Sequence, residues 1–204
     1  MDIAIFPLLK GLSLTFIITA TTCFFGIFFG SLLTIVTISK NSLLTSIGKA
    51  YVNLIRTIPL VVVLLGFFLV LPNFFGSHNR LMTALLAFIF FETAYFSEII
   101  RAGISVIPEE QLLAGRALGL KKSQVFRCIL LPQAILKMMP VVLLQGIIIF
   151  QDTSLVYMIG LNDFFTASYN QGQVTGELTQ YMLIAGLVYL VPSFLTGRCI
   201  KRWS

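Results

Sequence analysis

The sequence is short of charge and of histidine. Only 11% of its 204 residues are charged, whereas about a quarter are charged in an ordinary soluble domain. The acidic residues number 8 against 14 lysines and arginines, and 19 phenylalanines accompany one histidine. Because 57% of the residues are hydrophobic, this composition excludes an ordinary soluble domain and suits a surface that faces lipid rather than a catalytic centre.

Residues that could build a metal or nucleotide site are also scarce. The three cysteines have no C-x-x-C spacing and no histidine near them, which gives neither a zinc site nor a disulfide framework. The sequence contains no Gly-x4-Gly-Lys-Ser/Thr phosphate loop and no HExxH motif, and His78 stands alone in a predicted loop. We therefore expect no catalytic residue, metal site or cofactor in this chain, so any ATP and magnesium would belong to a separate protein. Nucleic acid is not an expected partner, because the basic residues are scattered between apolar runs.

Five apolar segments predict an all-α membrane protein in which residues 1–204 form one membrane domain. They cover residues 12–38, 52–72, 81–104, 134–150 and 179–197, against the ~20 residues that a helix needs to cross a bilayer. The first is too long for the core of a cleaved signal, so we expect it to be retained. Its Gly26 and Gly30 form a GxxxG pattern that predicts close helix packing. The second has only a short apolar core between Pro59 and Pro72, so it needs the preceding residues 50–55 to reach the length of a membrane span.

The distribution of basic residues predicts the orientation of these segments. All of the 14 lysines and arginines except Lys10 and Arg80 fall on one side of the predicted spans. Basic residues collect on the cytoplasmic side of membrane proteins. The N-terminus is therefore expected outside and the C-terminus in the cytoplasm, which agrees with an odd number of spans. The polar segment 107–132 is then cytoplasmic.

Segment 107–132 reads as two short helices joined by a tight turn. Pro108 suits the first helical position, and Gly119 is placed to end the first helix. Gly115 and Gly119 lie one turn apart, which predicts a shallow ridge that a second protein could approach closely. Ser123 is expected to cap the second helix and Pro132 to close it. From these features alone, docking to a protein groove and lying on lipid headgroups are equally good interpretations.

The spacing in this segment resembles a known motif. Gly119, nine further residues and then 129–132 (ILLP) resemble the cytoplasmic EAA-x3-G-x9-I-x-L-P loop of ABC importer permeases. The first triplet here is 113–115 (LAG), so the glutamate and one alanine are absent. Segments 95–104, 131–134 and 145–157 resemble polar amino-acid permeases, and most of all glutamate/aspartate import permeases. The resemblance covers residues 15–202.

The resemblance implies a fold, a set of partners and a coupling site. The fold would be that of a type I ABC importer permease with a cytoplasmic coupling helix, in the inner membrane of a bacterium. The partners would be a homologous permease subunit (in a hetero- or homodimer), two cytoplasmic ATPase subunits that hold ATP and magnesium, an external amino-acid-binding protein and the lipid bilayer. The residues expected to couple to the ATPase are Leu113, Ala114, Gly115, Ala117, Leu118, Gly119, Ile129 and Pro132.

Polar residues within the apolar segments are candidates for a substrate pathway. Glu92 lies roughly 17 Å into the third segment at ~1.5 Å per residue, near mid-membrane, where a charge is costly. It could line a path with Thr93 and Tyr95, or be held by a neighbouring helix for packing. The spacing of Glu98 and Arg101 predicts a structural ion pair. The resemblance adds Arg56, which belongs to the family's arginine–proline motif. It also adds a polar stretch that contains Gln145, Asp152, Thr153 and Ser154. The role of this stretch would be subunit contact or gating, or only helix termination.

Other functions remain open at this point. A stand-alone secondary transporter or channel would usually show paired repeats, and none is visible in five segments. A non-transporting scaffold is a third possibility. If the substrate is acidic, Glu92 would repel it unless it is protonated or paired with a cation, for which Lys137, Arg56 and Arg101 are the candidates.

Overall fold

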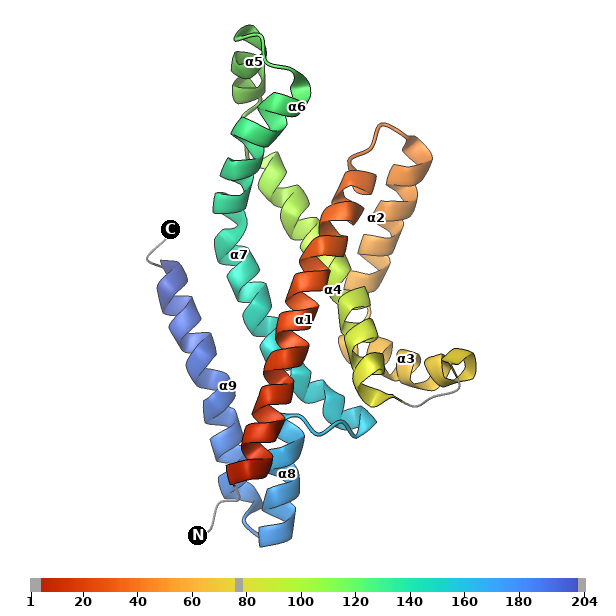
Figure 1. Cartoon of the computed structure of the whole chain (residues 1–204), viewed down its shortest axis with the longest axis vertical. Helices are drawn as coiled ribbons and strands as arrows, with labels where there is room; N and C mark the ends of the chain where they lie inside the picture. Colours follow the sequence, from red (N-terminus) through yellow and green to blue (C-terminus); the bar gives the residue numbers. More distant parts are fainter. Residues whose placement is uncertain (1–4, 76–78, 202–204) are drawn as a thin grey trace.

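The structure is a computed structural model that describes residues 5–75 and 79–201 (Figure 1). Within these ranges the chain forms helices joined by short connections, without a strand. The helices are α1 (Ile5–Thr37), α2 (Ser42–Thr57), α3 (Leu60–Phe75), α4 (Arg80–Ser105), α5 (Glu109–Ala117), α6 (Lys122–Val125), the π-helix η1 (Phe126–Leu130), α7 (Leu131–Asp152), the 3-10 helix η2 (Thr153–Ile159), α8 (Phe164–Thr175) and α9 (Leu178–Lys201). The predictions for His78 and for Arg202 in the basic tail lie outside the described residues.

The described part of the chain has four candidate membrane crossings, or the predicted five if one bent pair of helices counts as a single crossing. Among the described residues, four stretches are long and apolar enough to cross a membrane: α1, α4, Cys128–Ile159 around α7, and Leu178–Ile200 in α9. A fifth is obtained when α2 and α3 are taken together as one broken span. The helices α4, α7 and α9 extend the predicted segments by a few residues at both ends, and α1 begins at Ile5 rather than at residue 12.

The predicted continuous span 52–72 is wrong, because the chain bends by 104° between α2 and α3. The bend falls at Ile58 and Pro59. A proline pushes the residue before it out of the helical region, and Ile58 has extended angles, φ −94° and ψ 135°. The lead-in to the second apolar segment is therefore a separate helix, α2, and α3 turns away from it (Figure 1).

The helices α1 and α4 pack closely along their length. A Cβ added at Gly30 would lie 2.7 Å from the Cβ of Phe96 and 3.0 Å from the backbone N of Ser97, so only glycine fits there. One turn further on, the buried Thr34 hydroxyl donates to the carbonyl oxygens of Gly30 at 2.8 Å and of Ser97 at 3.0 Å. This close packing against α1 fixes the position of α4, and with it the position of the opposite face of α4.

The two ends of the molecule carry different elements. The α5–α6 pair lies at one end and α8 at the other, with α4 and α7 running between them (Figure 1). The start of α1 packs on α8, where a Cβ at Gly11 would lie 2.6 Å from the carbonyl oxygen of Asp163. Large apolar side chains such as Phe6, Phe24 and Leu69 are exposed, as expected of a surface that faces lipid or a partner subunit.

Candidate coupling hairpin and polar cavities

The helix α5 ends as its sequence predicts. Gly119 has φ +78°, a left-handed angle that favours glycine. The backbone N–H of Gly119 donates to Arg116 O at 2.9 Å, and that of Leu120 donates to Gly115 O at 3.2 Å. These two bonds form a Schellman motif, which satisfies carbonyls at the helix end. Pro108 is the N-cap residue of α5, one position earlier than predicted.

The predicted ridge of Gly115 and Gly119 is wrong at Gly115. This residue is buried, and a Cβ there would lie 2.8 Å from Cγ2 of Val125 and 3.2 Å from Cδ1 of Ile129. Gly115 therefore faces the inside of the hairpin formed by α5, α6 and η1, and it allows the two arms to touch. The outward surface consists instead of side chains around it, since Leu113 is 61% and Leu118 is 80% exposed. Ala114 and Ala117 are exposed beside them.

The second arm of the hairpin also differs from its prediction. The helix α6 begins at Lys122, and the side-chain oxygen of Gln124 accepts from the backbone N–H of Lys121 at 2.8 Å. Ser123 is therefore not the residue before the helix. Pro132 does not close this helix either, because α6 continues through the π-helix η1 into α7, with Pro132 in the first turn of α7.

The helices α4 and α7 bring Glu92 and Gln145 together. The Glu92 side chain is fully buried, and its Oε2 accepts from Nε2 of Gln145 at 2.8 Å. Its second oxygen, Oε1, has no hydrogen-bond partner among the described residues. The neighbouring helix thus satisfies half of this carboxylate. The other half is buried and unpaired among the described residues, which is uncommon for a polar side chain and marks Glu92 as a candidate for a functional role.

Two cavities meet beside this pair. The Glu92 cavity, of about 560 Å³, is lined on its polar side by Glu92 and Asp152 together with three further residues, Arg56, Tyr95 and Gln145. The Lys137 cavity, of about 430 Å³, is lined by the same three residues together with Lys137, Glu98 and others. Arg56, Tyr95 and Gln145 therefore form the boundary between the two cavities.

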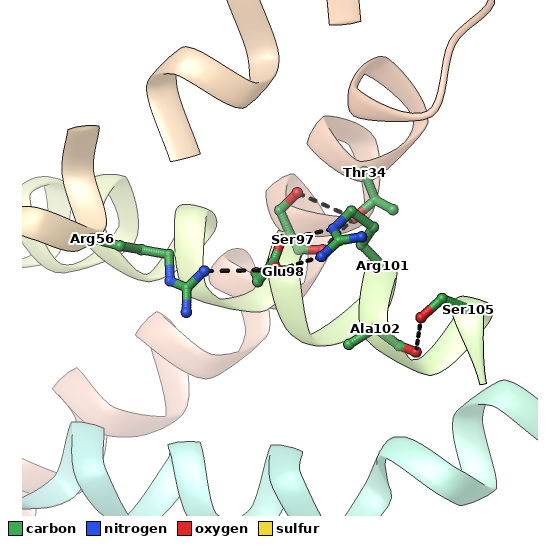
Figure 2. A network of polar contacts seen from close by, with 7 residues as sticks. All are labelled: Thr34, Arg56, Ser97, Glu98, Arg101, Ala102 and Ser105. Atoms are coloured by element: carbon green, nitrogen blue, oxygen red, sulfur yellow. Dashed lines mark hydrogen bonds and ion pairs between the residues drawn. The ribbon is translucent and has the colours of Figure 1, made fainter. Parts of the chain in front are cut away.

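An ion-pair network lies on the wall of the Lys137 cavity (Figure 2). The Arg101 guanidinium donates to both oxygens of Glu98, with Nε–Oε2 at 2.8 Å and Nη2–Oε1 at 2.5 Å. The predicted pair is present, and Arg56 joins it from α2, with its Nη1 at 3.8 Å from Glu98 Oε1. Arg56 also lies over the ring of Tyr95, with 5.4 Å between the guanidinium carbon and the ring centroid.

The structure separates the predicted pathway residues into two groups. Arg56, Glu92, Tyr95, Gln145 and Asp152 line the two cavities. The remaining three do not line either cavity, and their hydroxyls bond to nearby helix carbonyls, as helix-terminating and back-bonding residues do. They are Thr93 (to Ile89 O at 2.7 Å), Thr153 (to Phe150 O at 2.8 Å) and Ser154 (to Gln151 O at 2.8 Å).

A buried carboxylate that the sequence analysis did not identify lies at the opposite end of the molecule. Asp163 caps α8, and its carboxylate accepts from the backbone and hydroxyl of Thr166 and from the Tyr189 hydroxyl. Burial raises the pKa of the Asp163 carboxyl above its usual range, and these hydrogen bonds oppose that shift. The signal in the sequence was an aspartate directly before a run of apolar residues, with threonine three positions later. We assign this cluster to holding α1, α8 and α9 together.

The fold is that of an all-helical protein with several candidate membrane spans, a hairpin of short helices at one end and two cavities with polar lining residues. The chain belongs to the family described as the inner membrane component of binding-protein-dependent transport systems, whose sequence model matches residues 23–202. It is thus a permease subunit of an ABC amino-acid importer and a multi-pass membrane protein. Permease subunits are not enzymes, since ATP is hydrolysed by a separate subunit, as the resemblance implied.

Comparison with individual relatives narrows the family assignment to permeases for amino acids. The chain is 44% identical over 194 residues to the glutamate/aspartate import permease protein GltK of Escherichia coli, covering 91% of this chain and 87% of that protein. It is 32% identical to the arginine transport system permease protein ArtQ of Bacillus subtilis, covering 96% of this chain and 91% of that protein. The predicted resemblance to glutamate/aspartate permeases is confirmed.

Solved structures share the fold. An amino acid ABC transporter crystallised with histidines matches with a TM-score of 0.87 and 24% identity, over 97% of this chain and 92% of that one. An inward-facing MetNI methionine ABC transporter matches with a TM-score of 0.81 and 19% identity, over 100% of this chain and 99% of that one. The predicted ABC importer permease fold is confirmed.

Proposed function

We propose that this chain imports glutamate and aspartate across the inner membrane of a bacterium. The observation that carries the proposal is the 44% identity to a glutamate/aspartate import permease, which exceeds the 32% identity to an arginine permease over a similar length. In this arrangement the chain forms half of the pathway beside a second permease subunit. An external binding protein delivers the substrate, and two cytoplasmic ATPase subunits bind ATP and magnesium.

The charges around the cavities support an amino acid as the cargo. A glutamate molecule carries one ammonium and two carboxylates, so it needs acidic and basic partners in one space. The Glu92 cavity supplies carboxylates from Glu92 and Asp152 and the guanidinium of Arg56. The positive charge of Arg56 would offset the repulsion expected between Glu92 and an acidic substrate. Arg56 does this by lining the same cavity, and it does not pair with Glu92 itself.

The exposed face of the hairpin supports docking to an ATPase. Leu113, Ala114, Ala117 and Leu118 form an apolar surface on a polar segment outside the spans. Such a helix fits a groove on another protein, and its movement on ATP binding would rock the helices between inward-open and outward-open states. In this account Gly115 and Ile129 hold the hairpin together, Gly119 turns it, and Pro132 starts α7.

Reconstitution tests the proposal directly. The chain is incorporated into proteoliposomes with its second permease subunit, its ATPase and its binding protein, and uptake of radiolabelled glutamate is measured with competing amino acids. We expect ATP-dependent uptake that unlabelled aspartate inhibits and arginine does not. Uptake that continues after ATP is removed would indicate a secondary transporter instead.

The hairpin is tested in the same assay. Leu118→Asp places a charge on the exposed face, and Gly119→Trp puts a bulky side chain at a left-handed position. Both are expected to lower uptake more than tenfold while the chain still inserts into the membrane. Co-purification of the ATPase with Leu118→Asp measures docking, and unchanged co-purification together with unchanged uptake would remove the hairpin from the mechanism.

A further inference from the structure

Arg56 is the cation that lines both cavities in the part of the chain described here, and it is loosely held. Its Nη1 lies 3.8 Å from Glu98 Oε1, near the limit for an ion pair, and its side chain is 39% exposed. No hydrogen bond from its guanidinium to another described residue is present, although a guanidinium has five N–H donors. The guanidinium lies over the ring of Tyr95, and Arg56 lines both cavities.

Glu98, in contrast, does not depend on Arg56. Both of its oxygens accept from Arg101 in a two-pronged arrangement, which is the strongest geometry for this pair of groups. Partly exposed ion pairs at long distance contribute little, so removing Arg56 from Glu98 costs little. Figure 2 shows the asymmetry: Arg101 grips the carboxylate from the same helix, and Arg56 reaches it from α2.

The position of Arg56 decides what its spare donors can reach. It stands in the last turn of α2, just before the bend at Ile58 and Pro59, and at the boundary between the two cavities. Two carboxylates, Glu92 and Asp152, line the Glu92 cavity together with Arg56, and they suit an ammonium group. An α-amino acid that presents its ammonium to them has a carboxylate left for a cation.

We propose that Arg56 binds a carboxylate of the transported amino acid, and that Glu98 is an internal competitor that occupies the guanidinium when substrate is absent. This inference rests on the proposed function, because it requires an amino acid in the cavities. Substrate replaces a long, weak contact to Glu98 with a two-pronged carboxylate–guanidinium pair, and Arg101 keeps Glu98 satisfied meanwhile. The carboxylate bound is either the α-carboxylate or the side-chain carboxylate of the substrate.

The competition predicts opposite effects from two neutralising substitutions. Binding of radiolabelled glutamate is measured on the assembled transporter in nanodiscs without the binding protein. Arg56→Gln is expected to weaken binding at least about tenfold, the value of a charged hydrogen bond. Arg56→Lys should lie between Gln and wild type, since lysine keeps the charge but loses the planar fork. Glu98→Gln should tighten binding about two- to fivefold, because it removes the competitor.

Matched controls separate binding from folding. Lys49→Gln removes a charge from the same helix at an exposed position that lines neither cavity, and binding should equal wild type. Co-purification with the ATPase checks that each variant assembles. Competition by glutamine, which has only the α-carboxylate, and by isoglutamine, which has only the side-chain carboxylate, identifies the group that Arg56 holds: only that competitor weakens in Arg56→Gln.

The outcomes distinguish this inference from the proposed function. If wild type shows no ATP-driven glutamate uptake and no glutamate binding, the proposed function is wrong, and glutamate is then also excluded as the ligand of Arg56. If wild type binds and transports glutamate but assembled Arg56→Gln binds as wild type does, the inference alone is overturned. Weaker binding in Glu98→Gln would also overturn it, because a positioning role for Glu98 predicts that sign and competition predicts the reverse.

Discussion

The two faces of α4 are built in different ways. The face toward α1 is closely packed: Gly30 leaves no room for a Cβ against Phe96, and Thr34 donates to the carbonyl of Ser97. The face toward α2, α3 and α7 is open, with two cavities. Glu92 lies at the edge between the two faces, since it lines one cavity while a Cβ at Gly26 of α1 would lie 3.3 Å from its Cβ. One helix thus combines a fixed support with a polar wall, and adjacent residues such as Ser97 and Glu98 belong to different faces.

The largest expected effect comes from filling the packed face. Gly30→Leu would drive a side chain into the backbone and side chain of α4, and such overpacking costs about 3 kcal/mol. We expect little folded chain in the membrane, measured by fluorescence-detected size exclusion after solubilisation. Gly186→Leu in α9 is the matched control, since no atom lies within 4 Å of a Cβ there, and it should fold normally. If both variants fold equally well, the packed face is not a fixed support.

At Glu92, on the edge of the open face, an intermediate effect is expected on transport and not on folding. Glu92→Gln keeps the size of the side chain and replaces its carboxyl group with an amide, so we expect uptake to fall about tenfold with normal membrane insertion. Thr93→Val changes the next residue, whose hydroxyl bonds only to its own helix, and uptake should stay at the wild-type level. Equal losses in both variants would show that this part of α4 acts through packing.

The smallest expected effect is the loss of one hydroxyl group, that of Thr34, on the packed face. Thr34→Val has nearly the same shape but no hydroxyl, so it should cost about 1 kcal/mol and lower the melting temperature by roughly 2–4 °C. The KM for glutamate should be unchanged, because Thr34 lines neither cavity. A changed KM with an unchanged melting temperature would reverse the roles of the two faces.

Local patterns in the sequence predicted much of this molecule. Apolar runs of membrane-spanning length predicted the long helices, Gly119 predicted the end of α5, and the spacing of Glu98 and Arg101 predicted their ion pair. Each of these features depends only on residues within about one helical turn or one span. Pro59 signalled the bend between α2 and α3, but the short apolar core beside it looked like a span that needed a longer lead-in.

The features that the sequence could not provide are contacts between distant segments. Gly115 and Gly119 share a spacing of one turn, yet that spacing does not say which direction the face points, and Val125 and Ile129 cover Gly115. Thr93 adjoins Glu92 in sequence, but successive residues of a helix differ by about 100° in direction, so they reach different surfaces. Arg56 meets Glu98 because α2 packs against α4, a contact between helices that no local pattern reveals.

The unbroken path from α6 through η1 into α7 has a mechanical consequence. Leu131 and Gln145 are separated by about 21 Å of helix at ~1.5 Å per residue, and no loop interrupts that rod. A tilt imposed on the hairpin by an ATPase would therefore be transmitted along this helix toward Lys137 and Gln145, with Pro140 between these two residues as a point where the helix can bend. The side chains that border the cargo space would thus be moved directly by the motor rather than through a chain of intermediate contacts.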